Sequence, residues 1–208
     1  MATLFVACGG VAPREEPARE PQAAAAPTVT AQLDLFVEAP AAGGQLIFVG
    51  QQRMPQADRW PNAVFVPMSV FSVEKNGIPN ELPGADSLRR SLEALGVRGG
   101  NAVIVGDPIP AGRAYAAFDY LGLGDRVALL DGGIKALGEP PAAAAATPAA
   151  EPGNLPADSR ADIIVDAKWV HDRLNDRNVV ILDARPPEEF SGEKPGEGIT
   201  RPGHIPGA

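Results

Sequence analysis

The stretch from residue 92 to residue 137 decides the fold class, and it reads LEALGVRGGNAVIVGDPIPAGRAYAAFDYLGLGDRVALLDGGIKAL. Residues 102–105 and 127–130 are short apolar runs, each followed by glycine or an Asp-Gly-Gly turn, as expected for buried strands. Residues 111–121 between them carry apolar side chains at helical spacing, and Gly122 follows as a stop. Because continuous apolar strands that alternate with helices form parallel sheets covered on both faces, the stretch predicts an α/β domain.

The residues before this stretch predict more of the same architecture. Residues 46–49 and 63–66 are short apolar runs and predict two further buried strands. Residues 86–95 place leucines on one face of a predicted helix, with Asp86 as its N-cap and a glycine directly after it. Residues 31–37 predict a weak amphipathic turn at the start of the domain.

The chain divides into four predicted segments. Residues 1–28 form an N-terminal tail or signal remnant, and residues 29–138 form one complete domain. Residues 139–161 are rich in alanine and proline and predict a linker. Residues 162–208 then begin a second domain that the chain does not complete.

The second domain starts as a repeat of the first. Residues 166–174 predict a capped helix and residues 179–182 a buried strand. A helical segment, an apolar strand and a loop therefore occur in the same order as in residues 31–63, which indicates an internal repeat. With one strand and no partners for it, we expect poor order in this part of the chain.

Composition excludes several classes of function. The formal net charge is −8 and no block of lysine or arginine stands out, which argues against nucleic acid or an anionic membrane surface as the main partner. The sequence contains no run of 18 apolar residues, so no transmembrane span is predicted. With the single cysteine Cys8 and only two histidines, His171 and His204, neither a metal site nor a cofactor is expected. His171 falls on a polar helix position and is expected to be solvated.

The N-terminus leaves two alternatives open. A short apolar run before Cys8, followed by a polar tether, is typical of the end of a bacterial lipoprotein signal, which would make Cys8 a lipidation site and place the protein in the cell envelope or periplasm. However, the apolar run is too short for such a signal and no basic segment precedes it. The alternative is a disordered tail with an incidental cysteine on a cytoplasmic protein.

Two stretches carry a resemblance to a known family. The first is VVILDAR at residues 179–185, followed by EEFSG at 188–192 and GHIPGA at 203–208. The second is the stretch 92–137, with its LDGG turn after the last strand. Together they resemble the rhodanese family of sulfurtransferases in its tandem-domain form, over about residues 29–208 without the linker.

The resemblance implies a doubly wound α/β fold in each domain and a catalytic cysteine in the second. That cysteine would take sulfur from a small anionic donor, thiosulfate or 3-mercaptopyruvate, and pass it as a persulfide to a thiol or cyanide. The position that matches it in the first domain is Asp107, which cannot accept sulfur and marks that domain as a scaffold. Ala63 and Asp107 are 107 − 63 = 44 residues apart, so the repeat predicts the cysteine about as far beyond Ala208.

The resemblance also assigns roles to three residues of the second domain. Arg185 matches an arginine that faces the anionic donor, since a guanidinium can bind a carboxylate or thiosulfonate through two hydrogen bonds. The alternative for Arg185 is an exposed arginine paired with Glu188 or Glu189. Asp183 and His204 are expected to hold the loop together rather than to act in catalysis.

Two classes of function remain for the chain. One is a part of a thiosulfate or 3-mercaptopyruvate sulfurtransferase, inactive as given because its nucleophile lies beyond Ala208. The other is a non-catalytic rhodanese-like binding module tethered in the cell envelope.

Overall fold

The computed structural model describes residues 34–39, 44–140, 152–196 and 199–208. The described residues all fall within one compact unit. Cys8 and the predicted N-terminal tail lie outside the described residues.

Strands and helices alternate through the first domain. Their bounds are β1 Phe36–Val37, β2 Gln45–Gly50, η1 Pro55–Arg59, β3 Ala63–Pro67, η2 Met68–Phe71, β4 Val73–Lys75, β5 Ile78–Glu81, α1 Ala85–Ala94, β6 Ala102–Gly106, α2 Pro108–Tyr120, η3 Gly124–Arg126, β7 Val127–Leu130 and η4 Gly133–Lys135, followed by η5 Ala161–Ile163, α3 Ala167–His171 and α4 Pro187–Ser191.

The first domain is built on a five-stranded parallel sheet in the order β1-β7-β6-β2-β3, and a separate antiparallel hairpin joins β4 to β5. The four strands predicted from apolar runs are confirmed as β2, β3, β6 and β7. The amphipathic turn predicted for residues 31–37 is wrong where it is described, because Phe36–Val37 form strand β1. The amides of Leu129 and Asp131 donate to the carbonyls of Leu35 and Val37 and draw this segment onto the sheet.

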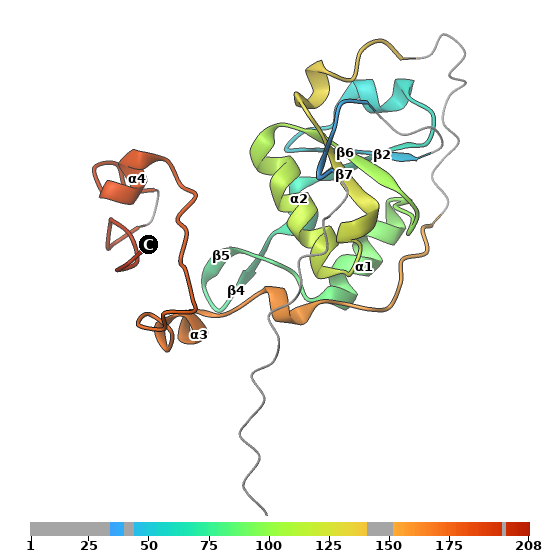
Figure 1. Ribbon diagram of the computed structural model, residues 1–208. Coiled ribbons are helices and arrows are strands. Elements are labelled where there is room, and N and C mark those ends of the chain that lie inside the picture. The colour runs from blue at the N-terminus through green and yellow to red at the C-terminus, as the bar shows by residue number, and fades with distance from the viewer. Residues whose placement is uncertain (1–33, 40–43, 141–151, 197–198) are drawn as a thin grey trace, which may run out of the picture. The chain divides into compact units, whose positions relative to one another are not determined.

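Alternate side chains of the strands supply two core layers. On β2, Ile47 and Val49 pack into the larger layer with α1 and α2, while Leu46 and Phe48 pack into the smaller layer with η1 and the segment after η4. Figure 1 shows α2 beside the strands β6 and β7. Successive side chains of a strand point to opposite faces of the sheet, and both faces are buried. This confirms the predicted α/β class.

Two helix starts differ from the sequence-based expectation. Asp86 is not the N-cap of α1: Gly84 holds that position, and the Asp86 carboxylate lies in the first turn, 2.7 Å from Nη1 of Arg89. The helix predicted for residues 111–121 begins earlier, directly after Asp107, with Pro108 at its first position. Proline has no amide hydrogen to satisfy there and its φ suits a helix, so the chain turns helical directly after β6.

The second half of the predicted linker packs against the first domain, and we call residues 153–160 the strap. Leu155 is 5% exposed and belongs to the core layer of α1 and α2. Its amide donates to Oε1 of Glu93 at 2.9 Å. Arg89 donates to three successive strap carbonyls, those of residues 156–158, at 2.8, 2.8 and 3.3 Å. The strap is therefore part of the folded domain rather than free chain.

The second domain's predicted helix is confirmed but short, and its predicted buried strand is wrong. Asp166 caps α3, because its carboxylate accepts from the amide of Trp169 at 2.7 Å. Residues 179–182 form no strand, and Val180 and Leu182 are 80% and 85% exposed. A strand needs neighbouring backbone to pair with, and within the described ranges no strand lies beside this apolar run.

Candidate functional site

The residues that carried the sequence resemblance surround one open pocket of about 730 Å³, which we call the C-terminal pocket. Its lining comes from two segments, Ile181, Leu182, Asp183, Ala184 and Arg185 on one side and Arg201, Pro202, Gly203, His204, Ile205, Pro206 and Ala208 on the other. The fold brings the Asp-x-Arg segment and the Gly-His-Ile-Pro-Gly-Ala segment together across an intervening stretch that includes α4.

Asp183 and Arg185 form the polar centre of this pocket. Arg185 donates from Nε to Oδ1 of Asp183 at 2.9 Å and from Nη2 to Oδ2 at 2.5 Å. The Arg185 amide also donates to Oδ1 at 3.1 Å. Hydrogen bonds from the Arg185 side chain and backbone lower the pKa of Asp183 to about 2, so its carboxylate stays charged at neutral pH.

Arg185 also ties the two pocket segments together. Its Nη2 donates to the carbonyl of Gly203 at 2.9 Å, and Nη1 lies 3.9 Å from Oε2 of Glu189. Most of the guanidinium is therefore occupied by protein acceptors, and only the Nη1 side retains free donor capacity. The pairing with Glu189 considered from the sequence is present as a long contact, and a direct role for Arg185 toward a donor stays a prediction.

His204 closes the loop from the other side. Its ring stacks on Phe190 of α4, with centroids 3.8 Å apart and planes 6° from parallel. Nδ1 lies 2.9 Å from the carbonyl oxygen of Phe190. Because a carbonyl can only accept, Nδ1 carries the proton in this contact. Sequence reasoning missed Phe190, although the Glu-Glu-Phe segment lay within the motif it used.

The matching place in the first domain is closed by backbone. A Cβ added at Gly106, directly before Asp107, would lie 2.6 Å from the carbonyl oxygen of Val49, and one at Gly133 would lie 2.6 Å from the carbonyl oxygen of Gly106. The strand ends and the turn after β7 thus pack directly on one another. Asp107 itself is exposed and makes no side-chain cap to α2.

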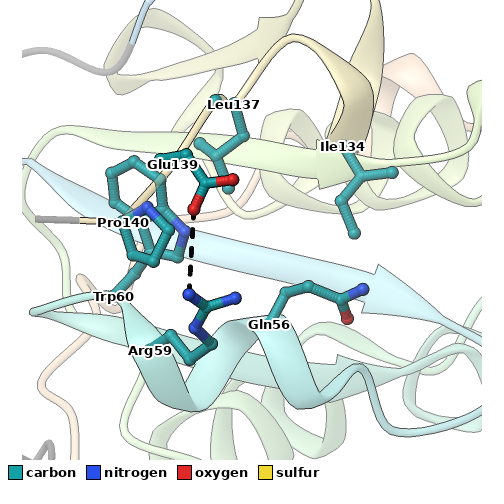
Figure 2. A pocket seen from close by; sticks show the side chains of 8 residues that line it. Gln56, Arg59, Trp60, Ile134, Leu137, Glu139 and Pro140 are labelled. Carbon is teal, nitrogen blue, oxygen red and sulfur yellow. Dashed lines mark ion pairs between the residues drawn. The ribbon is translucent and has the colours of Figure 1, made fainter.

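The first domain has a smaller hollow of about 210 Å³ between η1 and the segment after η4. Figure 2 shows Arg59 and Glu139 facing each other across it, with Trp60 and Leu137 among its walls, and the Arg59–Glu139 ion pair spans 3.8 Å. Arg59 and Trp60 supply part of this wall. The carboxylate of Glu139 already balances the guanidinium charge of Arg59.

The remaining sequence-based candidates contribute little to either pocket. His171 is exposed, with Nδ1 3.7 Å from the carboxylate of Asp172. No three His, Cys, Asp or Glu side chains in the described ranges are grouped to hold a metal ion. Every helix in the part of the chain that the structure describes is too short or too polar to cross a bilayer.

Comparison with known proteins agrees with this geometry. Residues 166–208, which contain the C-terminal pocket, match the family model described as Rhodanese-like domain. The probable 3-mercaptopyruvate sulfurtransferase of Pseudomonas aeruginosa is 35% identical over 135 residues, covering 61% of this chain and 46% of the relative. The chain thus spans about half the length of the curated relative that it matches.

Solved structures show the same fold at lower identity. The 3-mercaptopyruvate sulfotransferase SseA from Escherichia coli has a TM-score of 0.61 at 22% identity, over 82% of this chain and 67% of that one. The Tum1 protein from Saccharomyces cerevisiae has a TM-score of 0.58 at 20% identity, over 79% and 62% of the two chains. The anaerobic ergothioneine biosynthesis enzyme from Chlorobium limicola has a TM-score of 0.58 at 21% identity, over 79% and 43%.

The parallel α/β sheet of the first domain, together with these structural neighbours, shows that the chain has the rhodanese fold. The chain is similar to the rhodanese family, through the match of residues 166–208 to its domain model and the 35% identity to the Pseudomonas aeruginosa relative.

Proposed function

We propose that this chain is the scaffold domain and the opening of the catalytic domain of a sulfurtransferase that moves sulfur through a cysteine persulfide. The observation that carries the proposal is the C-terminal pocket, where Arg185, Asp183 and His204 converge within the stretch that matches the rhodanese-like domain. The relative from Pseudomonas aeruginosa favours 3-mercaptopyruvate as the donor, with thiosulfate as the other member of the same chemical class.

The proposed chemistry needs a thiolate that this pocket does not contain. A cysteine thiolate attacks the outer sulfur of thiosulfate, the S–S bond breaks and sulfite leaves with the electron pair. With 3-mercaptopyruvate the C–S bond breaks instead, its electron pair leaves with the carbon as the enolate of pyruvate, and a proton from water converts the enolate to pyruvate. Cyanide or a thiolate then removes the outer sulfur from the persulfide and restores the thiolate. We place this nucleophile beyond Ala208, at the repeat position of Asp107, and not at Cys8.

The first domain is proposed as scaffold because its counterpart of the nucleophile is Asp107. A carboxylate cannot accept sulfur and repels an anionic donor. The segment directly after Asp107 is the first turn of α2, and its Pro108 and Pro110 have no amide hydrogen to donate to a persulfide. The alternative of a wholly non-catalytic module is not favoured, because the curated relative is an enzyme by its description.

The test is a sulfurtransferase assay on two proteins, the 208-residue chain and the protein translated from the coding DNA past Ala208. Thiocyanate release from cyanide is followed with 3-mercaptopyruvate and with thiosulfate as donors. We expect activity in the longer protein, none in the 208-residue chain, and loss of activity when the cysteine of the second-domain loop is changed to serine. Activity in the 208-residue chain that Cys8→Ser abolishes would reverse the assignment of the nucleophile.

An envelope location through lipidation of Cys8 is a separate proposal, supported by the apolar run and polar tether around it. It is tested by metabolic labelling with a fatty acid in bacteria that express the natural gene. Label that depends on Cys8 supports an anchor, and a soluble unlabelled protein contradicts it.

A further inference from the structure

Two guanidinium groups line the C-terminal pocket, those of Arg185 and Arg201. They differ in what they already bind. Arg185 pairs with Asp183 through Nε and Nη2 and donates to the carbonyl of Gly203. Its charge is balanced by the carboxylate of Asp183, with Glu189 at the longer distance of 3.9 Å.

Arg201 has no such partner among the residues that the structure describes. Its side chain makes no hydrogen bond or ion pair there, although it lies in the pocket lining beside Pro202 and Gly203. Arg59, in the first-domain hollow, shows the contrast, because Glu139 faces it at 3.8 Å. Of the two arginines in the C-terminal pocket, Arg201 is the one whose guanidinium makes no hydrogen bond and faces no carboxylate among the described residues.

The backbone that carries Arg201 is held in place by Arg185. Gly203 has φ +104°, a conformation that suits glycine, and its carbonyl accepts the Nη2 hydrogen bond of Arg185. Pro202, which lies between Arg201 and Gly203, restricts the chain further through its fixed φ. One residue beyond Gly203, the His204 ring is stacked on Phe190. The segment is thus anchored at Gly203 and at His204, two and three residues after Arg201.

The rest of the lining is mainly apolar, with Ile181, Leu182 and Ile205 around the two arginines. An apolar wall with one free guanidinium suits a small organic or inorganic anion, because the guanidinium can bind a carboxylate or sulfonate group through two hydrogen bonds. The balanced Asp183–Arg185 pair adds no net repulsion toward such an anion.

We propose that Arg201 is the residue that binds the anionic group of the sulfur donor, and that Arg185 is a positioning residue that holds the Arg201 segment through Gly203. This inference rests on the proposed function and names the donor contact within the same pocket. It changes the expected role of Arg185 from direct contact to support.

The first experiment measures donor binding without turnover. The 208-residue chain is titrated with thiosulfate, and separately with 3-mercaptopyruvate, while NMR follows the arginine Nε–H signals and the backbone amides of residues 199–208. We expect saturable shifts in the native chain and an affinity about tenfold or more weaker in Arg201→Met, since one charge-assisted contact is lost. Arg201→Lys keeps the charge and recovers part of the affinity.

The matched control is Arg177→Met, which removes an exposed arginine outside the pocket and leaves binding unchanged. Equal affinity in Arg201→Met and the native chain overturns the inference, as does a native chain that shows no saturable binding. Arg185→Met separates the two roles: broadened amide signals at residues 201–204 in the absence of donor indicate positioning, whereas unchanged signals with lost binding assign the donor contact to Arg185.

The second experiment uses the longer protein from the Proposed function. Arg201→Met there should raise KM for the donor about tenfold or more while kcat changes little, because the contact is made before the sulfur moves. A native longer protein that transfers no sulfur would contradict the proposed function itself. An active native protein with an unaltered KM in Arg201→Met would contradict this inference alone.

Discussion

The guanidinium of Arg185 grips both carboxylate oxygens of Asp183, with Nε 2.9 Å from Oδ1 and Nη2 2.5 Å from Oδ2. Only one residue separates Asp183 from Arg185 in the chain, so the pair forms locally and needs no distant element. The same Nη2 reaches the carbonyl of Gly203, 18 residues further on. This local pair therefore also fixes the opposite wall of the C-terminal pocket.

The pair predicts how Asp183 titrates. Its pKa is lowered from 3.8 to about 2, mainly by the hydrogen bond from the Arg185 side chain. A carboxyl group with a lowered pKa in the folded chain contributes stability that is present above pH 3.8 and is lost as the pH falls through about 2. In Arg185→Met we expect the midpoint to rise toward 3.8, measured by carbon NMR of the Asp183 carboxyl group. Arg177→Met is the control. An unchanged titration midpoint of Asp183 in Arg185→Met would show that Arg185 does not lower the pKa of Asp183.

The stack of His204 on Phe190 predicts local order in the pocket loop. In Phe190→Leu we expect amide hydrogen exchange at residues 203–208 to become about two- to tenfold faster. This factor corresponds to the stabilisation that one aromatic pair contributes. The His204 ring protons should also lose the upfield shift that a stacked ring causes. Phe36→Leu, at a side chain 56% exposed in β1, serves as the control. Equal exchange rates in Phe190→Leu and the native chain would show that the stack does not order the loop.

The strap predicts a large difference between two leucines. Leu155 is 5% exposed in the core of the first domain, so Leu155→Ala should lower the free energy of unfolding by about 2–5 kcal/mol. Leu182 is 85% exposed, and Leu182→Ala in the same 208-residue chain should change it by less than about 0.5 kcal/mol. Urea unfolding followed by circular dichroism measures both. A small effect of Leu155→Ala would mean that the strap is not an integral part of the domain.

The close packing at the strand ends of the first domain predicts that Gly106 does not tolerate a larger side chain. In Gly106→Ala the new Cβ would lie 2.6 Å from the carbonyl oxygen of Val49, and backbone of the neighbouring strand must move to admit it. We expect a loss of about 1–3 kcal/mol or more in the free energy of unfolding. Gly100→Ala, where nothing lies within 4 Å of the new Cβ, is the matched control. Thermal unfolding compares the two, and equal melting temperatures would refute the close packing.

Local pattern determined most of the first domain. The apolar runs at 46–49, 63–66, 102–105 and 127–130 became strands of one parallel sheet, because each run buries side chains on both faces and neighbours are present to pair with. The Asp183–Arg185 contact also follows from spacing alone, since a side chain two residues away lies within reach of an Asp carboxylate.

Tertiary structure decided what short windows of sequence do not contain. The run at 179–182 has the same apolar character as the four strands, yet it forms no strand and its Val180 and Leu182 are exposed, because a strand also needs a neighbouring backbone to pair with. The alanine- and proline-rich composition predicted a linker at 139–161. Leu155 is nevertheless buried, because it packs into the same core layer as the side chains of α1 and α2. The stack of Phe190 on His204 likewise forms only when the chain folds back over 14 residues. The sequence by itself determined which segments could be strands and helices and which family they resemble, whereas burial, pairing and the separate roles of Arg185 and Arg201 depend on distances that only the folded chain sets.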